Sequence, residues 1–161
     1  MSFLSSPFSI RRLTAEDWAL MADMMTTFGA AFEDEATYTA ARPSQRYLKR
    51  LLASDSFIAL AALKQGSVVG GIAAYELQKF EQERSEIYIY DLAVAAAHRR
   101  EGIATALIQK LKTIAAARAA SVIYVQADRD DAPAIALYTK LGLREDVLHF
   151  DIPVATRDAA G

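Results

Sequence analysis

The chain has 161 residues, of which 53% are hydrophobic and 24% charged, a balance typical of a single soluble globular domain. Its 18 basic and 20 acidic side chains give a formal net charge of −2, so we expect no nucleic-acid partner. The lack of cysteine excludes disulfides and cysteine–zinc sites, and we expect no metal. No apolar run approaches the ~18 residues that a membrane span needs, which predicts a cytoplasmic protein without a membrane partner.

The N-terminal part of the chain predicts one strand and one helix. Residues 8–13 alternate weakly between polar and apolar side chains and are expected to form the strand. Thr14, with Asp17 three residues later, can cap a helix that extends towards Phe32. We expect residues 33–35 to lie in an acidic loop.

A second helix, a hairpin and a further strand are predicted next. Ser44 can begin a helix that extends to residue 52. Apolar runs at residues 56–63 and 68–77 flank a short turn containing Gly66, which indicates a β-hairpin. Residues 86–94 are rich in β-prone side chains and predict the strand.

The C-terminal part continues the alternation of helices and strands. Residues 103–118 have helical spacing of apolar side chains, and residues 121–127 predict a strand. Pro133 suits the first turn of a helix that Gly142 ends, with strands around residues 147–152. The whole is expected to be one α/β (α+β) domain over residues 1–161, with a mixed, mostly antiparallel central sheet flanked by helices and a loose tail from about residue 153.

The most informative motif is Arg99-Arg100-Glu101-Gly102-Ile103-Ala104, an R-x-x-G-x-A pattern between a predicted strand and a predicted helix. Glycine lets a ligand approach the backbone closely, and the first turn of a helix has unpaired N–H groups that suit phosphate. Arg99 and Arg100 add charge, and Thr105 adds a hydroxyl. Alone, the pattern is also typical of a surface turn, but its position favours a diphosphate site.

In this position the motif resembles the acetyl-CoA loop of the GNAT superfamily, Q/R-x-x-G-x-G/A. Residues 134–142 are similar to the later A-x-x-L-Y-x-K-L-G helix of that family, with Asp131 where asparagine is frequent and Leu143 where phenylalanine is frequent. The resemblance implies a GNAT fold with acetyl-CoA as cosubstrate, and is compatible with a homodimer. It implies cofactor contacts from Leu92, Ala93, Val94, Arg99, Arg100, Glu101, Gly102, Ile103, Ala104, Thr105, Asp131 and Tyr138.

Within that family the chain resembles most the aminoglycoside 3-N-acetyltransferases of the gentamicin-resistance type. Residues 85–94, 123–128 and 149–152 carry this resemblance, and residues 57–62 and 79–82 add weaker matches. It implies acetyl transfer to the 3-amino group of a 2-deoxystreptamine ring. Acetylation of another small amine, such as a polyamine, and a noncatalytic acyl-CoA sensor remain alternatives.

Asp91 is the expected acceptor of the amine proton, because an amine attacks a thioester only as the free base. Simple alternation places Asp91 on one face with Ile87 and Ile89, an apolar environment for a carboxylate. The resemblance implies that the strand bulges near residues 91–94 and exposes backbone donors to the pantetheine arm and the thioester carbonyl. A solvated edge carboxylate or a structural ion pair is the alternative for Asp91.

Tyr138 matches the tyrosine that commonly protonates the departing thiolate in this family, and packing of its ring is the alternative. Its ordinary pKa near ~10 keeps it protonated at neutral pH. Because aminoglycosides are polycations, their site is expected to hold several carboxylates. The candidates, each also typical of a solvated surface or a helix cap, are Asp34, Glu35, Asp91, Asp128 and Asp151.

Overall fold

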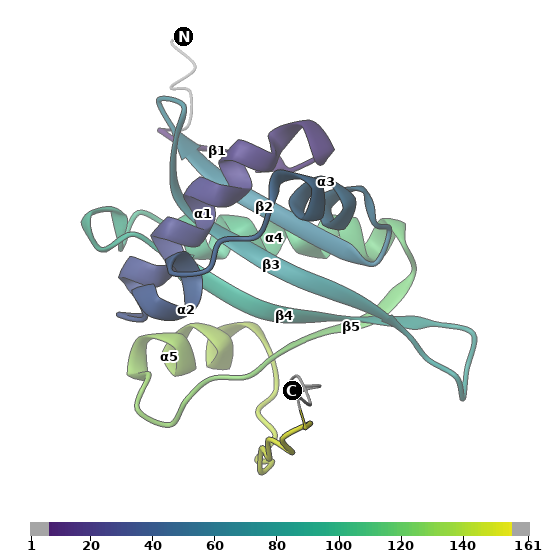
Figure 1. The fold of residues 1–161 in the computed structure, drawn as a ribbon. Coiled ribbons are helices and arrows are strands. Elements are labelled where there is room, and N and C mark those ends of the chain that lie inside the picture. Colours follow the sequence, from purple (N-terminus) through teal and green to yellow (C-terminus); the bar gives the residue numbers. More distant parts are fainter. Residues whose placement is uncertain (1–6, 156–161) are drawn as a thin grey trace, which may run out of the picture. The chain divides into compact units, whose positions relative to one another are not determined.

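The computed structural model describes residues 7–155 and divides the chain into two compact units, Met1–Gln126 and Ala127–Gly161. The first unit holds a five-stranded sheet in the order β1-β2-β3-β4-β5 (Figure 1). Neighbouring strands are antiparallel except β4 and β5, which are parallel. The strands are β1 (Ser9–Arg12), β2 (Phe57–Lys64), β3 (Ser67–Gln78), β4 (Ser85–Val94) and β5 (Ala120–Val125). The expected mixed, mostly antiparallel sheet is confirmed.

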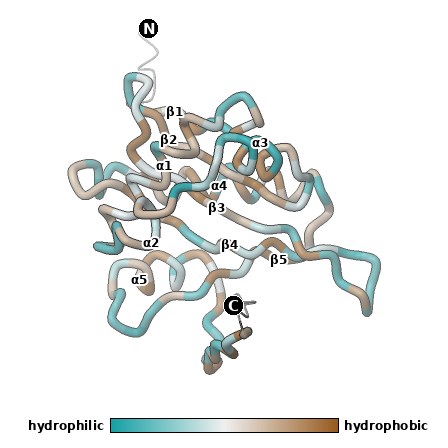
Figure 2. The backbone as a smooth tube through the Cα atoms, viewed as in Figure 1, coloured by the Kyte–Doolittle hydropathy of each residue, from teal (hydrophilic) through white to brown (hydrophobic). Residues whose placement is uncertain are grey.

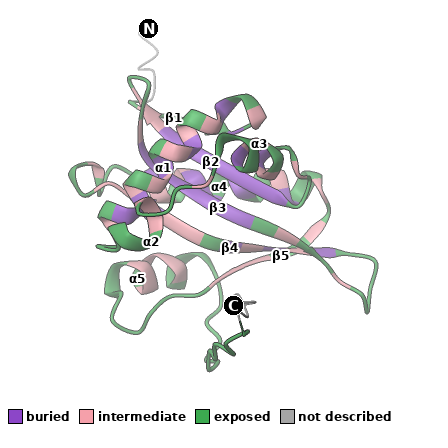
Figure 3. Ribbon diagram, in the orientation of Figure 1, coloured by how far each residue is buried: buried purple, intermediate pink, exposed green. Residues whose placement is uncertain are grey.

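Helices cover both faces of this sheet. Helices α1 (Trp18–Ala31) and α3 (Gln45–Ala53) lie on one face, and α4 (Ile103–Ala117) lies on the other (Figure 1). Figure 3 shows that burial is concentrated in β2 and β3, the strands covered on both sides. Figure 2 shows a mostly hydrophilic connection between β3 and β4, where the hairpin extends beyond the helices. None of the described helices is both long and apolar enough to cross a membrane.

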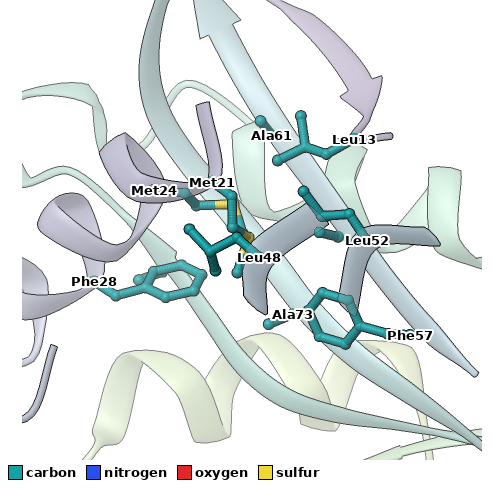
Figure 4. Close-up of a cluster of buried hydrophobic side chains, with 11 residues drawn as sticks. Leu13, Met21, Met24, Phe28, Leu48, Leu52, Phe57, Ala61 and Ala73 are labelled. Carbon is teal, nitrogen blue, oxygen red and sulfur yellow. The ribbon is translucent and has the colours of Figure 1, made fainter. Parts of the chain in front are cut away.

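The core between α1, α3 and the sheet is a continuous apolar cluster (Figure 4). Met24 and Phe28 of α1 are almost fully buried in it. Gly71 of β3 permits this packing, because a Cβ atom there would lie 2.1 Å from the Sδ of Met24. Ile72 and Ile89, outside this cluster, are buried on the α4 side. Successive side chains along β3 therefore point alternately to the face covered by α1 and α3 and to the face covered by α4.

The structure departs from the sequence-based expectations in two places. The acidic loop expected at residues 33–35 is present at residues 33 and 34, but Glu35 already begins a short helix, α2 (Glu35–Thr39), that was not predicted. The side chain of Asp34 caps this helix by accepting a hydrogen bond from the backbone N–H of Thr37. The strands expected around residues 147–152 are absent from the described part of the chain. Alternating side chains form a strand only beside a partner, and Phe150 is 77% exposed.

The second unit contains α5 (Ala132–Leu141), which begins at the expected Pro133 turn and ends before Gly142. Residues 143–155 follow without regular secondary structure. The single domain over residues 1–161 stays a prediction, as does the loose tail, most of which lies outside the described residues.

Candidate active site

Strand β4 has a β-bulge at Tyr90. Ile89 pairs with Ala74, but Asp91 pairs with Ala73, so β3 offers no residue opposite Tyr90. The extra residue reverses the alternation of side chains, and Asp91 joins Ala73 on the face covered by α1. The expectation that Asp91 shares a face with Ile87 and Ile89 is therefore wrong. The expected bulge is present, immediately before the segment for which it was predicted.

Asp91 is half-buried and receives a hydrogen bond from Tyr38, whose Oη lies 2.9 Å from Oδ2 of the carboxylate. Burial raises the pKa of Asp91 above its usual value, and the hydrogen bond from Tyr38 opposes that rise. The pKa of Tyr38 is raised well above its usual value by burial and then by Asp91, so its hydroxyl stays a donor. Over residues 7–155, no basic side chain forms an ion pair with Asp91.

Tyr38 is held in place by α1 and by the start of its own helix. Its ring packs against Phe28 and Phe32, with centroid separations of 6.1 and 5.6 Å. Gly29 permits close packing, since a Cβ there would lie 3.2 Å from the Cβ of Tyr38. Asp34 caps the same helix, so the hydroxyl that meets Asp91 is fixed by local contacts.

The edge of β4 that faces β5 is open beyond the bulge. The last paired residues of the two strands are Ile89 and Val125, and β4 continues to Val94 without a β5 partner. In an extended strand, backbone N–H and C=O groups point alternately to its two edges. The backbone of residues 92–94 therefore offers polar groups without a β5 partner on this edge, as an acyl-pantetheine site requires.

The loop before α4 has backbone features of an anion site. Gly102 has φ +81° and Arg100 has φ +64°, both in the left-handed region. No side chain caps the helix at Gly102, so the first-turn N–H groups of Ile103, Ala104 and Thr105 have no such acceptor. A Cβ at Gly102 would meet no atom within 4 Å, which leaves this side of the loop open.

The charged side chains of this loop differ in their partners. Glu101 is engaged, with Lys64 Nζ at 2.7 Å and His98 Nδ1 at 3.3 Å from its carboxylate. In the described part of the chain, neither Arg99 nor Arg100 pairs with a carboxylate, and Arg99 Nε donates to the carbonyl of Val94 at 3.4 Å. The two guanidinium groups are thus available to a diphosphate, while Glu101 anchors the loop to β2.

The second unit holds the predicted tyrosine and three of the predicted carboxylates. Burial, followed by the charge of Asp131, raises the pKa of Tyr138 to about 12. Asp131 caps α5 through a hydrogen bond of 3.1 Å from the backbone N–H of Ala134. Asp151 is 3.0 Å from His149, with both side chains exposed, and the backbone carbonyl of Asp128 accepts a hydrogen bond from Asp131. Both Asp131 and Asp151 thus have local partners.

Within the first unit, the structure brings several of the predicted site residues together. Asp34 and Glu35 begin the helix that carries Tyr38, and Tyr38 joins this helix to Asp91. Tyr38 itself was missed, because nothing in the sequence links it to a carboxylate 53 residues away. Among residues 7–155, no three His, Asp or Glu side chains gather as a metal site would require.

Residues 18–143 match the acetyltransferase (GNAT) family. The chain is similar to the structure of an aminoglycoside acetyltransferase from an uncultured soil metagenomic sample, with 63% identity and a TM-score of 0.91 over 96% of this chain and 100% of the other. No curated protein matched.

Two further solved structures are similar over most of their length. One is a soil metagenomic aminoglycoside acetyltransferase in complex with sisomicin, with 28% identity and a TM-score of 0.86 over 92% of this chain and 97% of the other. The other is a ribosomal-protein-alanine N-acetyltransferase from Brucella melitensis biovar Abortus, with 25% identity and a TM-score of 0.72 over 92% and 99%.

Proposed function

The chain belongs to the acetyltransferase (GNAT) family, and we propose that it acetylates an amino group of an aminoglycoside. The observation that carries the proposal is the half-buried Asp91 carboxylate, which lies beside the open edge of β4 and lacks a cationic partner in the described part of the chain. A cationic amine would supply that partner. The similarity to two aminoglycoside acetyltransferases favours an aminoglycoside as the amine.

The residues of the first unit fit the cosubstrate of this family. Acetyl-CoA supplies an acetyl group activated as a thioester. The open loop at Gly102, the uncapped start of α4 and the guanidinium groups of Arg99 and Arg100 would hold its diphosphate. The backbone of residues 92–94, which has no β5 partner, would hold the pantetheine arm and polarise the carbonyl.

Asp91 would bind the substrate and accept its proton. The amine nitrogen gains a bond to the acetyl carbon only with its lone pair free, so it must lose a proton. A carboxylate whose pKa is raised by burial is a better base than an exposed one, and it stays ionised for proton acceptance when its pKa is below the working pH. Asp34 and Glu35 would contribute further attraction for a polycation.

Tyr138 would donate the proton that the departing thiolate needs. Its raised pKa of about 12 supports this role, since the hydroxyl is protonated at neutral pH. Asp128 and Asp151 would be further substrate carboxylates, and Asp131 would lie next to the cofactor, as the family resemblance implies. A homodimer is also proposed on that resemblance, and light scattering in solution tests it.

The finer proposal is that the 3-amino group of a gentamicin-like 2-deoxystreptamine ring is acetylated. Support comes from the resemblance carried by residues 85–94, 123–128 and 149–152. A panel of gentamicin, kanamycin, spermidine and an N-terminal peptide, assayed by release of the CoA thiol, tests the substrate class. We expect turnover of gentamicin. Turnover of spermidine alone would instead identify a polyamine acetyltransferase, and acetyl-CoA binding without thiol release for any amine would identify a sensor.

A further inference from the structure

Four tyrosine rings form a row across β3, β4 and β5 next to Asp91. Tyr75, Tyr88 and Tyr124 lie directly opposite one another on these neighbouring strands. Tyr88 and Tyr124 stack with 4.7 Å between centroids and 9° between planes. Tyr90, at the bulge, meets both Tyr75 and Tyr88 edge to face, at 6.0 and 5.9 Å.

The row lies on the same face of the sheet as Asp91. Tyr75 is two residues from Ala73, which pairs with Asp91, so alternation places the tyrosine and the carboxylate on one side. The row also touches the core, since Tyr75 packs 5.2 Å from Phe57, which is 3% exposed. Burial comes first among the causes that raise the pKa values of Tyr75 and Tyr88, and the Asp91 charge contributes to both.

Internal packing alone does not account for the row. Tyr90 is 62% exposed and Tyr75 is 36% exposed, although their strands are among the most buried elements of the fold. The hydroxyl of Tyr88 donates to Gln126 Oε1 at 3.0 Å, which fixes one ring of the row. Tyr75 and Tyr90 therefore expose aromatic surface to solvent beside the bulge that positions Asp91.

The electrostatics of this surface favour a cation with an apolar face. The faces of aromatic rings carry negative potential, and the adjoining Asp91 carboxylate has no basic partner among residues 7–155. In the same part of the chain, Arg50 forms a cation–π contact with Tyr47, and both residues lie in α3, outside the tyrosine row. An amino sugar combines ammonium groups with an apolar C–H face, whereas a linear polyamine has no ring to stack.

We infer that Tyr75, Tyr88 and Tyr90 form a binding subsite for an amine-bearing sugar ring, which stacks on the aromatic row with an ammonium group directed to Asp91. This inference rests on the proposed function and adds the residues that recognise the sugar. Tyr90 is the most exposed member, so it is expected to make the largest contact. The row and Asp91 together then select ring-bearing cations over linear ones.

The test is calorimetric titration of the acetyl-CoA-free protein with gentamicin and, separately, with acetyl-CoA. Tyr90→Leu keeps apolar bulk but removes the ring, so we expect gentamicin binding to weaken by about 3- to 30-fold. Tyr90→Phe keeps the ring and is expected to bind within about 3-fold of wild type. Acetyl-CoA affinity is expected to be unchanged in both. Tyr47→Leu, the same change at an exposed tyrosine of α3, is the matched control.

The outcomes separate this inference from the function on which it rests. If wild type fails to bind gentamicin, the proposed function is wrong and the subsite is wrong with it. If wild type binds gentamicin and Tyr90→Leu binds equally well, or Tyr90→Phe loses as much as Tyr90→Leu, only the subsite is wrong. If circular dichroism shows that Tyr90→Leu is unfolded, Tyr75→Leu is titrated with gentamicin instead, and equal binding to wild type would again show that the subsite is wrong.

Discussion

Tyr38 donates a hydrogen bond of 2.9 Å to Asp91, and this contact joins α2 to the bulged strand of the sheet. The two residues lie 53 positions apart in the sequence. The tyrosine opposes the effect of burial on the Asp91 pKa, and its hydroxyl fixes one carboxylate oxygen. Tyr38 is therefore a positioning residue for the proposed base.

Replacing Tyr38 by phenylalanine tests that role. The hydrogen bond stabilises the ionised carboxylate, so its loss should raise the Asp91 pKa further. Because the base acts in its ionised form, the acid limb of the kcat/KM profile should move to higher pH, with most of the activity recovered on the alkaline side. Tyr47→Phe is the control. An acid limb that stays in place would assign Tyr38 to packing alone.

Asp91→Asn should reduce acetyl transfer by about 10²- to 10⁴-fold while acetyl-CoA affinity changes little. Asparagine keeps the shape of the side chain but removes its charge and basicity. Raising the pH should partly restore the rate, because more of the substrate is present as free amine. Turnover of the variant at the wild-type rate would show that Asp91 is a structural carboxylate and not the base.

Gly102→Val should weaken acetyl-CoA binding, because the side chain would enter the open side of the loop and strain a backbone with φ +81°. Gly66→Val is a matched control, since Gly66 has φ +79° and equally open surroundings in the turn between β2 and β3. Calorimetry on both folded variants separates ligand contact from strain. Equal affinities in the two variants would contradict the assignment of the phosphate loop.

Tyr138→Phe should slow acetyl transfer by about 10- to 10⁴-fold and leave acetyl-CoA affinity unchanged, since the ring remains and only the proton donor is lost. Rates at saturating substrates are compared with binding measured on the same preparation. Turnover equal to that of the parent would assign Tyr138 to packing in α5.

Much of the fold could be predicted from the sequence, because local signals agreed with the final structure. The hairpin around Gly66, the helix after Gly102 and the helix begun by Pro133 each have a turn residue or cap at the expected place. The strands expected around residues 147–152 fail for a physical reason: alternation describes a strand but does not supply the neighbour that it needs.

The site was harder to predict because it depends on register and on contacts between distant residues. Alternation placed Asp91 with Ile89, and one unpaired residue, Tyr90, moves it to the other face. Tyr38, which donates a hydrogen bond to Asp91, lies in α2. This helix was not predicted, because the acidic residues 33–35 indicated a loop. By contrast, the turn at Gly102 before α4 was predictable, since it depends on a local glycine, and its role in binding phosphate stays a prediction.

The most direct test of the central proposal is to locate the acetyl group by NMR in the product formed from gentamicin and acetyl-CoA. Acetylation of the 3-amino group of the 2-deoxystreptamine ring is the expected result. Acetylation of a different amine would contradict the regiochemistry, and absence of any aminoglycoside product beside rapid turnover of spermidine would contradict the substrate class.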